Sequence, residues 1–80
     1  MPRDDADAIE ELERQHRLGD LVRRARRAIG MGRPDQAAQL ADEALALAPD
    51  TTTVEELLGD VAMAEGHFVE ARQHYHRALE

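Results

Sequence analysis

The chain of 80 residues contains no cysteine, serine, lysine, asparagine or tryptophan, and it has a single phenylalanine and a single tyrosine. Without cysteine it can form neither a disulfide nor a thiolate zinc site, which fits a reducing compartment. Covalent catalysis usually requires Ser, Cys, Lys or an activated Thr. The threonines, Thr51 to Thr53, cluster where a helix is expected to begin. We therefore expect no enzyme, no catalytic residue and no cofactor.

Long apolar runs are also missing. No segment approaches the length of a membrane-spanning helix, and the acidic N-terminus lacks the hydrophobic region of a signal peptide. The expected location is therefore the cytoplasm, with no membrane partner. An alanine-rich chain with 34% charged residues favours helix, and no segment shows a strand pattern. The expected fold class is all-α.

Charge is unevenly distributed along the chain, whose net charge is −7. Residues 1–17 carry −3, residues 18–33 carry +4 and residues 34–80 carry −8. The basic block holds four arginines within five positions: Arg23, Arg24, Arg26 and Arg27. Such a run is usually the solvated face of a helix that packs by its other side. Nucleic acid is disfavoured as a partner, because acidic segments flank the block and no aromatic residues interleave with it.

The sequence repeats with a period of 34 residues. A shift of 34 superposes Ala28 on Ala62, Gly32 on Gly66, Ala37 on Ala71, Ala44 on Ala78 and Leu45 on Leu79, and it places Ala25 on Gly59. A fixed period between 20 and 50 residues is typical of stacked supersecondary units. Small residues at matched positions indicate helices whose axes approach closely.

Each unit is predicted to contain two helices. In the first unit, apolar residues follow helical spacing from Leu18 to Ile29, glycines then stop the helix, and a second helix runs from Pro34 to Pro49. In the second unit, Thr52 with Glu55, or Thr53 with Glu56, is predicted to form a capping box. An apolar face follows over residues 57–62, Gly66 breaks the chain, and the last helix covers residues 68–79.

These features resemble the tetratricopeptide repeat (TPR) family over roughly residues 18–80. The family pattern is carried in the second unit by Leu58, Gly59, Gly66, Ala71, Tyr75 and Ala78, and in the first by Leu21, Ala25, Ala28, Gly32, Ala37, Ala44 and Pro49. The resemblance implies two antiparallel helical hairpins stacked as a short right-handed solenoid. The first repeat would span residues 18–51. The second would span residues 52–80 and stop before its closing proline.

The resemblance also implies a non-catalytic protein–protein interaction module that binds a peptide segment of a partner in a concave groove. By position, the groove residues would be Val22, Arg23, Arg26, Ile29, Glu56, Asp60 and Met63, whereas Arg24 and Arg27 would point elsewhere. The chain lacks the Lys and Asn residues with which chaperone-binding members hold a C-terminal carboxylate. Arg23 and Arg26 could still hold an acidic segment by forked hydrogen bonds.

Both ends of the chain fall outside the repeat pattern. Residues 1–17 form an N-terminal extension in which an extra helix over residues 4–17 is expected, with a narrow apolar seam of Ile9, Leu12 and His16. Two roles stay open for it: a cap on the array, or an acidic segment that covers the arginines. The last helix has no polar cap after it, so a self-associating structural module that forms homo-oligomers through this helix is the alternative function.

Two further side-chain patterns suggest chemistry but favour simpler explanations. His67, Glu70 and His74 fall along one stripe of the last helix, and two imidazoles with a carboxylate are plausible metal ligands. The two histidines are separated by about two helical turns, roughly 10 Å of rise, so solvent-facing polar residues are favoured over a metal site. Tyr75 is interpreted as a core aromatic.

Overall fold

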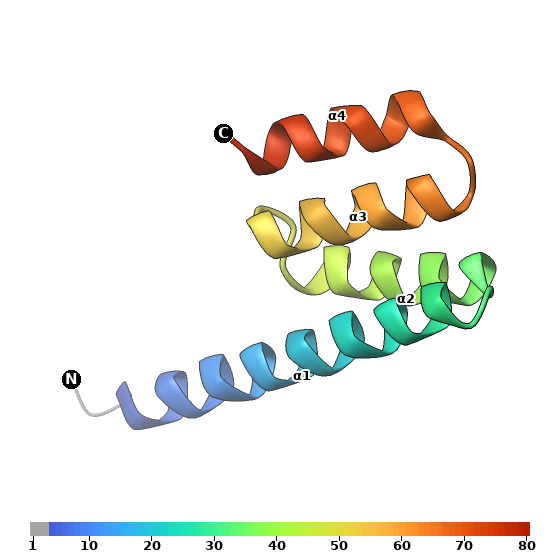
Figure 1. Cartoon of the computed structure of the whole chain (residues 1–80). Coiled ribbons are helices and arrows are strands. Elements are labelled where there is room, and N and C mark those ends of the chain that lie inside the picture. Colours follow the sequence, from blue (N-terminus) through green and yellow to red (C-terminus); the bar gives the residue numbers. More distant parts are fainter. Residues whose placement is uncertain (1–3) are drawn as a thin grey trace.

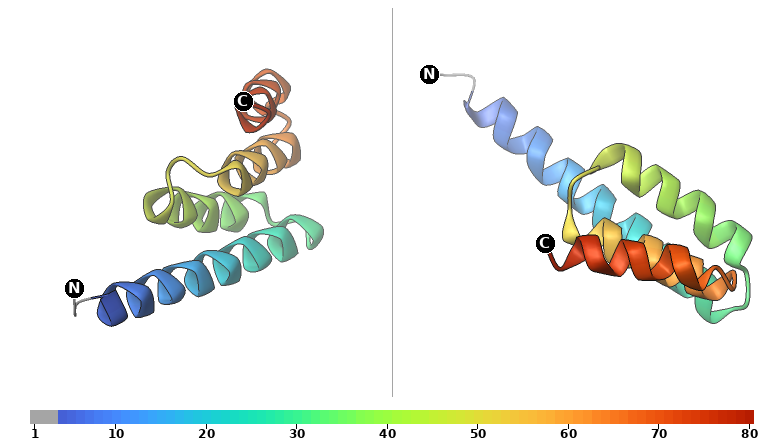
Figure 2. Two further views of the ribbon diagram at one scale, coloured as in Figure 1. Left: turned by 90° about the vertical axis from the view of Figure 1, so that its left-hand side faces the viewer. Right: turned by 90° about the horizontal axis from the view of Figure 1, so that it is seen from above.

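The computed structural model describes residues 4–80, which fold into four helices with no strand among them. Helix α1 comprises Asp4–Gly30, α2 Pro34–Leu47, α3 Thr52–Ala64 and α4 Phe68–Ala78. Figure 1 shows that the helices are layered in chain order, with α1 and α4 outermost, and Figure 2 shows the same order from a second side. Helices α1 and α2 form one hairpin, α3 and α4 form the other, and α3 packs on both helices of the first. The prediction of an all-α fold with two helical hairpins is confirmed, while right-handed solenoid stacking stays a prediction.

The two hairpin turns have the same backbone structure, 34 residues apart. Gly32 and Gly66 adopt φ values of 72° and 81°, in the left-handed region that glycine enters without steric cost. In both turns the following amide, of Arg33 or His67, donates a 2.8 Å hydrogen bond to the carbonyl five residues earlier. This is the Schellman arrangement, so the sequence repeat is also a repeat of local structure.

Helix α1 differs from the expectation of a separate N-terminal helix. It is continuous for 27 residues, so the predicted extension is the first half of the same helix that begins the first hairpin. The weakest helix former near residue 18 is Gly19, and one glycine inside a helix costs only about 1 kcal/mol relative to alanine. The described extension, residues 5–17, is exposed throughout and projects past the other helices (Figure 1).

The start of α3 also differs from the prediction. Its N-cap is Thr51, whose hydroxyl oxygen accepts a 3.2 Å hydrogen bond from the amide of Val54. The predicted capping boxes at Thr52 and Thr53 are therefore wrong by one or two residues. A sequence pattern cannot distinguish three consecutive threonines as helix caps. Thr51 is the one that caps α3, and its hydroxyl also donates a hydrogen bond to the carbonyl of Ala48, three residues earlier.

The core is built largely of alanine. The side chains that are fully buried at the contact of α1, α2 and α3 include Ala25, Ala37, Ala41, Ala44, Val54 and Leu57. Small side chains permit close approach of the helix axes and fix the relative position of α1 and α3. That position decides which polar side chains of the two helices meet at the surface.

Candidate interaction surface

An ion pair joins the two repeats at the same position of each. Arg26 of α1 and Asp60 of α3 are 34 residues apart, and the guanidinium Nη1 donates to the carboxylate Oδ2. The Arg26 side chain is 45% exposed and that of Asp60 32% exposed. An ion pair this open to solvent contributes little to stability, about 1 kcal/mol or less. Its main consequence is to neutralise the arginine that the sequence assigned to an acidic partner.

Tyr75 of α4 completes a triad with this ion pair. Its hydroxyl donates a 2.5 Å hydrogen bond to the second carboxylate oxygen of Asp60. Burial of the half-buried side chain, followed by the hydrogen bond and the negative charge of Asp60, raises the pKa of Tyr75 to about 12, although Arg26 acts in the opposite direction. The Arg26–Asp60–Tyr75 triad thus connects α1, α3 and α4, and the tyrosine stays protonated as a donor at neutral pH.

The ring of Tyr75 fits over Gly59. A methyl group at this glycine would lie 2.5–2.9 Å from three ring carbons, far inside the contact distance of about 3.5–4.0 Å between carbon atoms. Gly59 is thus required by close approach, and its helical backbone has no positive φ. In the Leu58-Gly59 pair of the sequence pattern, the glycine therefore leaves space for the ring of Tyr75, whose hydroxyl donates to Asp60.

A surface hollow of about 470 Å³ surrounds the triad. We call it the inter-repeat hollow, and the residues that line it are Arg26, Ile29, Asp60, Met63, Ala64 and Tyr75. Four of the seven residues predicted for the groove therefore lie together, contributed by equivalent parts of α1 and α3. Tyr75 was missed, because the sequence pattern assigns its ring to the core and says nothing about where its hydroxyl points.

The other three predicted groove residues do not line this hollow. Val22 is half-buried against the core. Arg23 lies 3.9 Å from Asp20 on its own helix, one turn away. Glu56 is exposed on α3, one turn before Asp60. Their role in a groove stays a prediction.

The remaining arginines of the basic block lie at a different place. Arg24 and Arg27 line a small hollow at the turn between α1 and α2, together with Arg33, and Arg24 pairs with Asp20 at 3.6 Å. The basic block is therefore divided between two surfaces of α1. Only Arg26 reaches the inter-repeat hollow.

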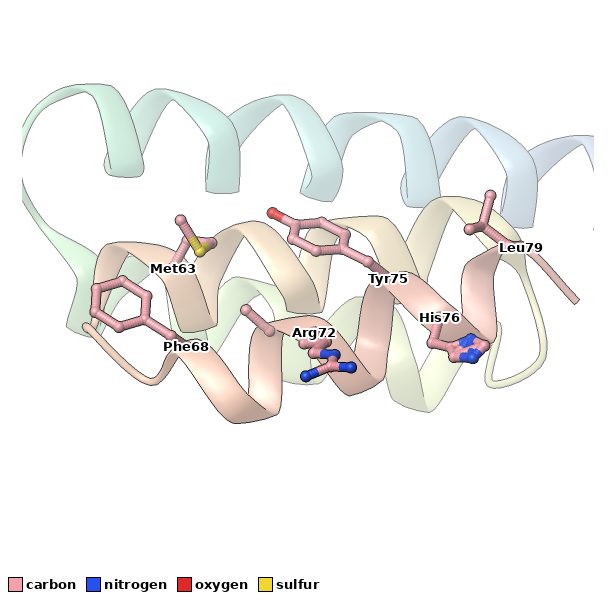
Figure 3. A pocket seen from close by; sticks show the side chains of 7 residues that line it. Met63, Phe68, Arg72, Tyr75, His76 and Leu79 are labelled. Carbon is pink, nitrogen blue, oxygen red and sulfur yellow. The ribbon is translucent and has the colours of Figure 1, made fainter.

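A second hollow of about 470 Å³ adjoins the first along α4 (Figure 3). Its lining residues, which we call the tail face, are Met63, Phe68, Ala71, Arg72, Tyr75, His76 and Leu79. Phe68 is 63% exposed and Leu79 is 87% exposed. Figure 3 shows both side chains on the same long side of α4 as the tyrosine ring. The residues that the sequence places in the last helix thus form an open apolar strip.

His67, at the N-cap of α4, and His74, within α4, lie near different carboxylates. His74 Nδ1 lies 2.9 Å from Glu55 of α3, whereas His67 lies 3.6 Å from Glu65 and 4.0 Å from Glu70. His67 and His74 therefore do not share a partner. Among residues 4–80 no group of three His, Cys, Asp or Glu side chains is arranged to hold a metal ion.

Comparison with known proteins identifies the family but no individual relative. No curated protein and no solved structure matches the chain. None of the helices between residues 4 and 80 is both long and apolar enough to cross a membrane. A family model described as tetratricopeptide repeat matches residues 28–80, which include both left-handed glycines, the ion-paired Asp60 and Tyr75. The chain belongs to the tetratricopeptide repeat family, whose repeats form protein–protein interaction modules.

Proposed function

We propose that this domain is a non-catalytic module that binds a peptide segment of a partner protein across the inter-repeat hollow. The observation that carries the proposal is that Arg26, Ile29, Asp60 and Met63, from equivalent positions of two successive repeats, line one open depression beside Tyr75. Apolar walls with a few fixed polar groups are the usual composition of a binding site. A cytoplasmic location remains the expectation from the sequence.

The triad determines what kind of peptide suits the hollow. Asp60 already neutralises Arg26, so a wholly acidic peptide would gain little from the arginine and would be repelled by the carboxylate. Guanidinium has five donors, and the contact with Asp60 engages Nη1. The proposed ligand therefore places apolar side chains against Ile29 and Met63, and one acidic group on the exposed edge of Arg26.

Selection from a phage-displayed random peptide library on the immobilised domain tests this proposal. Peptides enriched on the wild type should bind Ala64→Glu at least about tenfold more weakly, which corresponds to about 1.4 kcal/mol. Ala64 is exposed and lines this hollow but not the tail face, so the added charge changes the site without entering the core. The matched control is Gln39→Glu, which adds the same charge on the exposed side of α2 and should bind as the wild type does.

A second variant separates the apolar from the acidic part of the ligand. Arg26→Gln should weaken peptides that carry an acidic residue and leave uncharged ones unchanged. The proposal would be wrong if no peptide is enriched, or if the enriched peptides bind Ala64→Glu and Gln39→Glu equally well.

The second candidate function is self-association through α4. The observation in its favour is the exposure of Phe68 and Leu79, together with Val69 at 72%, because clustered exposed apolar side chains mark interaction sites. Light scattering over a wide concentration range measures it. A molecular mass that rises with concentration in the wild type, but not in Phe68→Glu/Leu79→Glu, is expected if α4 forms the contact.

A further inference from the structure

Two apolar surfaces lie at opposite ends of the chain, and no other described residue covers either. One is the tail face on α4. The other belongs to the first half of α1, residues 5–17, which we call the head segment. Within it Ile9 is 56% and Leu12 64% exposed. The question is whether these two surfaces fit each other.

The apolar seam of the head segment does not continue the core stripe of α1. A helix turns about 100° per residue, so Leu12 lies about 180° and Ile9 about 120° around α1 from the buried Leu21. The second half of α1 packs on α2 with the Leu21 side. Since α1 is one unbroken helix, Ile9 and Leu12 face away from the molecule's own core. Within the described residues 4–80, no other helix lies on this side of the head segment.

The tail face on α4 is equivalent, by the repeat, to a surface of α2 that another helix of this chain covers. A shift of 34 residues places Ala71, Tyr75 and Leu79 on Ala37, Ala41 and Leu45 of α2. The first helix of the second repeat, α3, packs against α2 of the first, and Leu45 of α2 is partly buried against the core. Its counterpart Leu79 is 87% exposed. By repeat equivalence, an amphipathic helix that lies on α4 as α3 lies on α2 would cover the tail face.

The charges around the two surfaces have opposite signs. Asp5 and Glu13 lie within about 40° of the apolar seam when α1 is projected along its axis. Arg72 and His76 line the tail face. The head segment as a whole carries five acidic residues against two arginines, whereas α4 carries two arginines against one glutamate. Docking of the two would bring unlike charges together at the rim of an apolar contact.

We propose that the head segment of one molecule docks on the tail face of a second copy. This inference rests on the self-association put forward as the second candidate function, and it names the two surfaces that meet. The two cannot meet within one molecule, because α1 and α4 are the outermost layers and the head segment projects away from α4 (Figure 1). The contact is heterologous: a pair of molecules keeps one free head segment and one free tail face, so further molecules can add until an open chain or a closed ring forms.

A complementation experiment tests the pairing. Ile9→Glu/Leu12→Glu blocks the head and leaves the tail face intact, whereas Phe68→Glu/Leu79→Glu does the reverse. All four side chains are more than half exposed, so both variants should keep the wild-type circular dichroism spectrum. Light scattering is expected to show concentration-dependent association of the wild type and of the Gln39→Glu control. Each blocked variant alone should be a monomer, and their equimolar mixture should form a dimer and nothing longer.

Salt gives a second readout. The wild-type association should weaken as sodium chloride rises, because charges at the exposed rim of an interface are screened. An association that does not weaken with salt would contradict the assigned charge pairing.

Three outcomes overturn the inference in different ways. A wild type that stays monomeric at all concentrations removes self-association and the inference together. If the tail-blocked variant is monomeric but the head-blocked variant still associates, self-association through α4 stands and the assigned partner surface is wrong. If the mixture of blocked variants stays monomeric while the wild type associates, the head segment of one molecule does not dock on the tail face of another and the assigned pairing is wrong. Peptide selection with Ala64→Glu is independent of all three.

Discussion

Replacing Gly59 by alanine should destabilise the domain, although alanine is the better helix former. The added methyl would lie 2.5 Å from Cε1 of Tyr75 and 2.7 Å from Cδ1. The three nearest atoms all belong to this ring, so the ring has to move outward. A displaced ring also withdraws the hydroxyl from Asp60, which now accepts its hydrogen bond at 2.5 Å.

The magnitude follows from three contributions. Overpacking of one methyl typically costs about 1–3 kcal/mol, and loss of the hydrogen bond costs about 1 kcal/mol. Helix propensity returns about 1 kcal/mol on exchange of glycine for alanine. The expected net loss is therefore about 1–3 kcal/mol. Urea unfolding followed by far-ultraviolet circular dichroism measures it as a lower midpoint at constant slope.

Two controls isolate the contact with the ring. Gly30→Ala makes the same change at the end of α1, where an added methyl meets nothing within 4 Å, and its effect should lie between neutral and about 1 kcal/mol stabilising. In a Tyr75→Ala background, Gly59→Ala should likewise lose its penalty, giving a coupling free energy of about 2–4 kcal/mol across the double-mutant cycle. The reasoning is refuted if Gly59→Ala destabilises equally with and without the ring.

Three further predictions concern single side chains. Tyr75 is the only tyrosine, so its ultraviolet absorbance should titrate with a midpoint near 12 in the folded protein and lower in Asp60→Asn, where burial still raises the pKa of the tyrosine but the hydrogen bond and the negative charge of Asp60 are gone. Because the folded pKa is the higher one, this group's contribution to stability is complete below pH 10 and is lost as pH rises toward 12. Thr51→Ala should lower the free energy of unfolding by about 1 kcal/mol through loss of the α3 cap, whereas Thr53→Ala should leave it nearly unchanged in the same urea assay. Leu57→Ala, at a fully buried position, should cost about 2–5 kcal/mol by calorimetry or urea unfolding.

Helix positions were predictable from sequence because local chemistry fixes them. The glycines at 32 and 66 both adopt the left-handed conformation that ends a helix, and Pro34 begins α2 as its first residue. The continuity of α1 was not predictable from the repeat, because a 34-residue register marks where a repeat begins and not where a helix begins. The one sequence feature that indicates a continuous α1 is the lack of a strong helix breaker near Gly19, and a search for repeats does not detect this feature.

The site was predictable in its positions but not in its contacts. The 34-residue register places Arg26 and Asp60 on the same side of equivalent helices in the two repeats, and the two side chains do lie together. Their pairing with each other depends on how closely α1 and α3 approach, which the buried alanines decide. Tyr75 was also predicted only in part. Its ring packs over Gly59, as expected for a core aromatic, but its hydroxyl belongs to the surface triad, which the sequence pattern did not indicate.

The two repeats solve the same packing problem with different pairs of residues. Ala25 and Ala41 occupy the positions that Gly59 and Tyr75 occupy 34 residues later, and both alanines are fully buried. In the first repeat two methyl groups share the space between the helices. In the second repeat the position of the first methyl is a glycine, because the ring of Tyr75 occupies the space where a methyl would lie. Only the larger side chain extends to the surface with a polar end, so the exchange that fills the core of the second repeat also places the hydroxyl that holds Asp60 against Arg26.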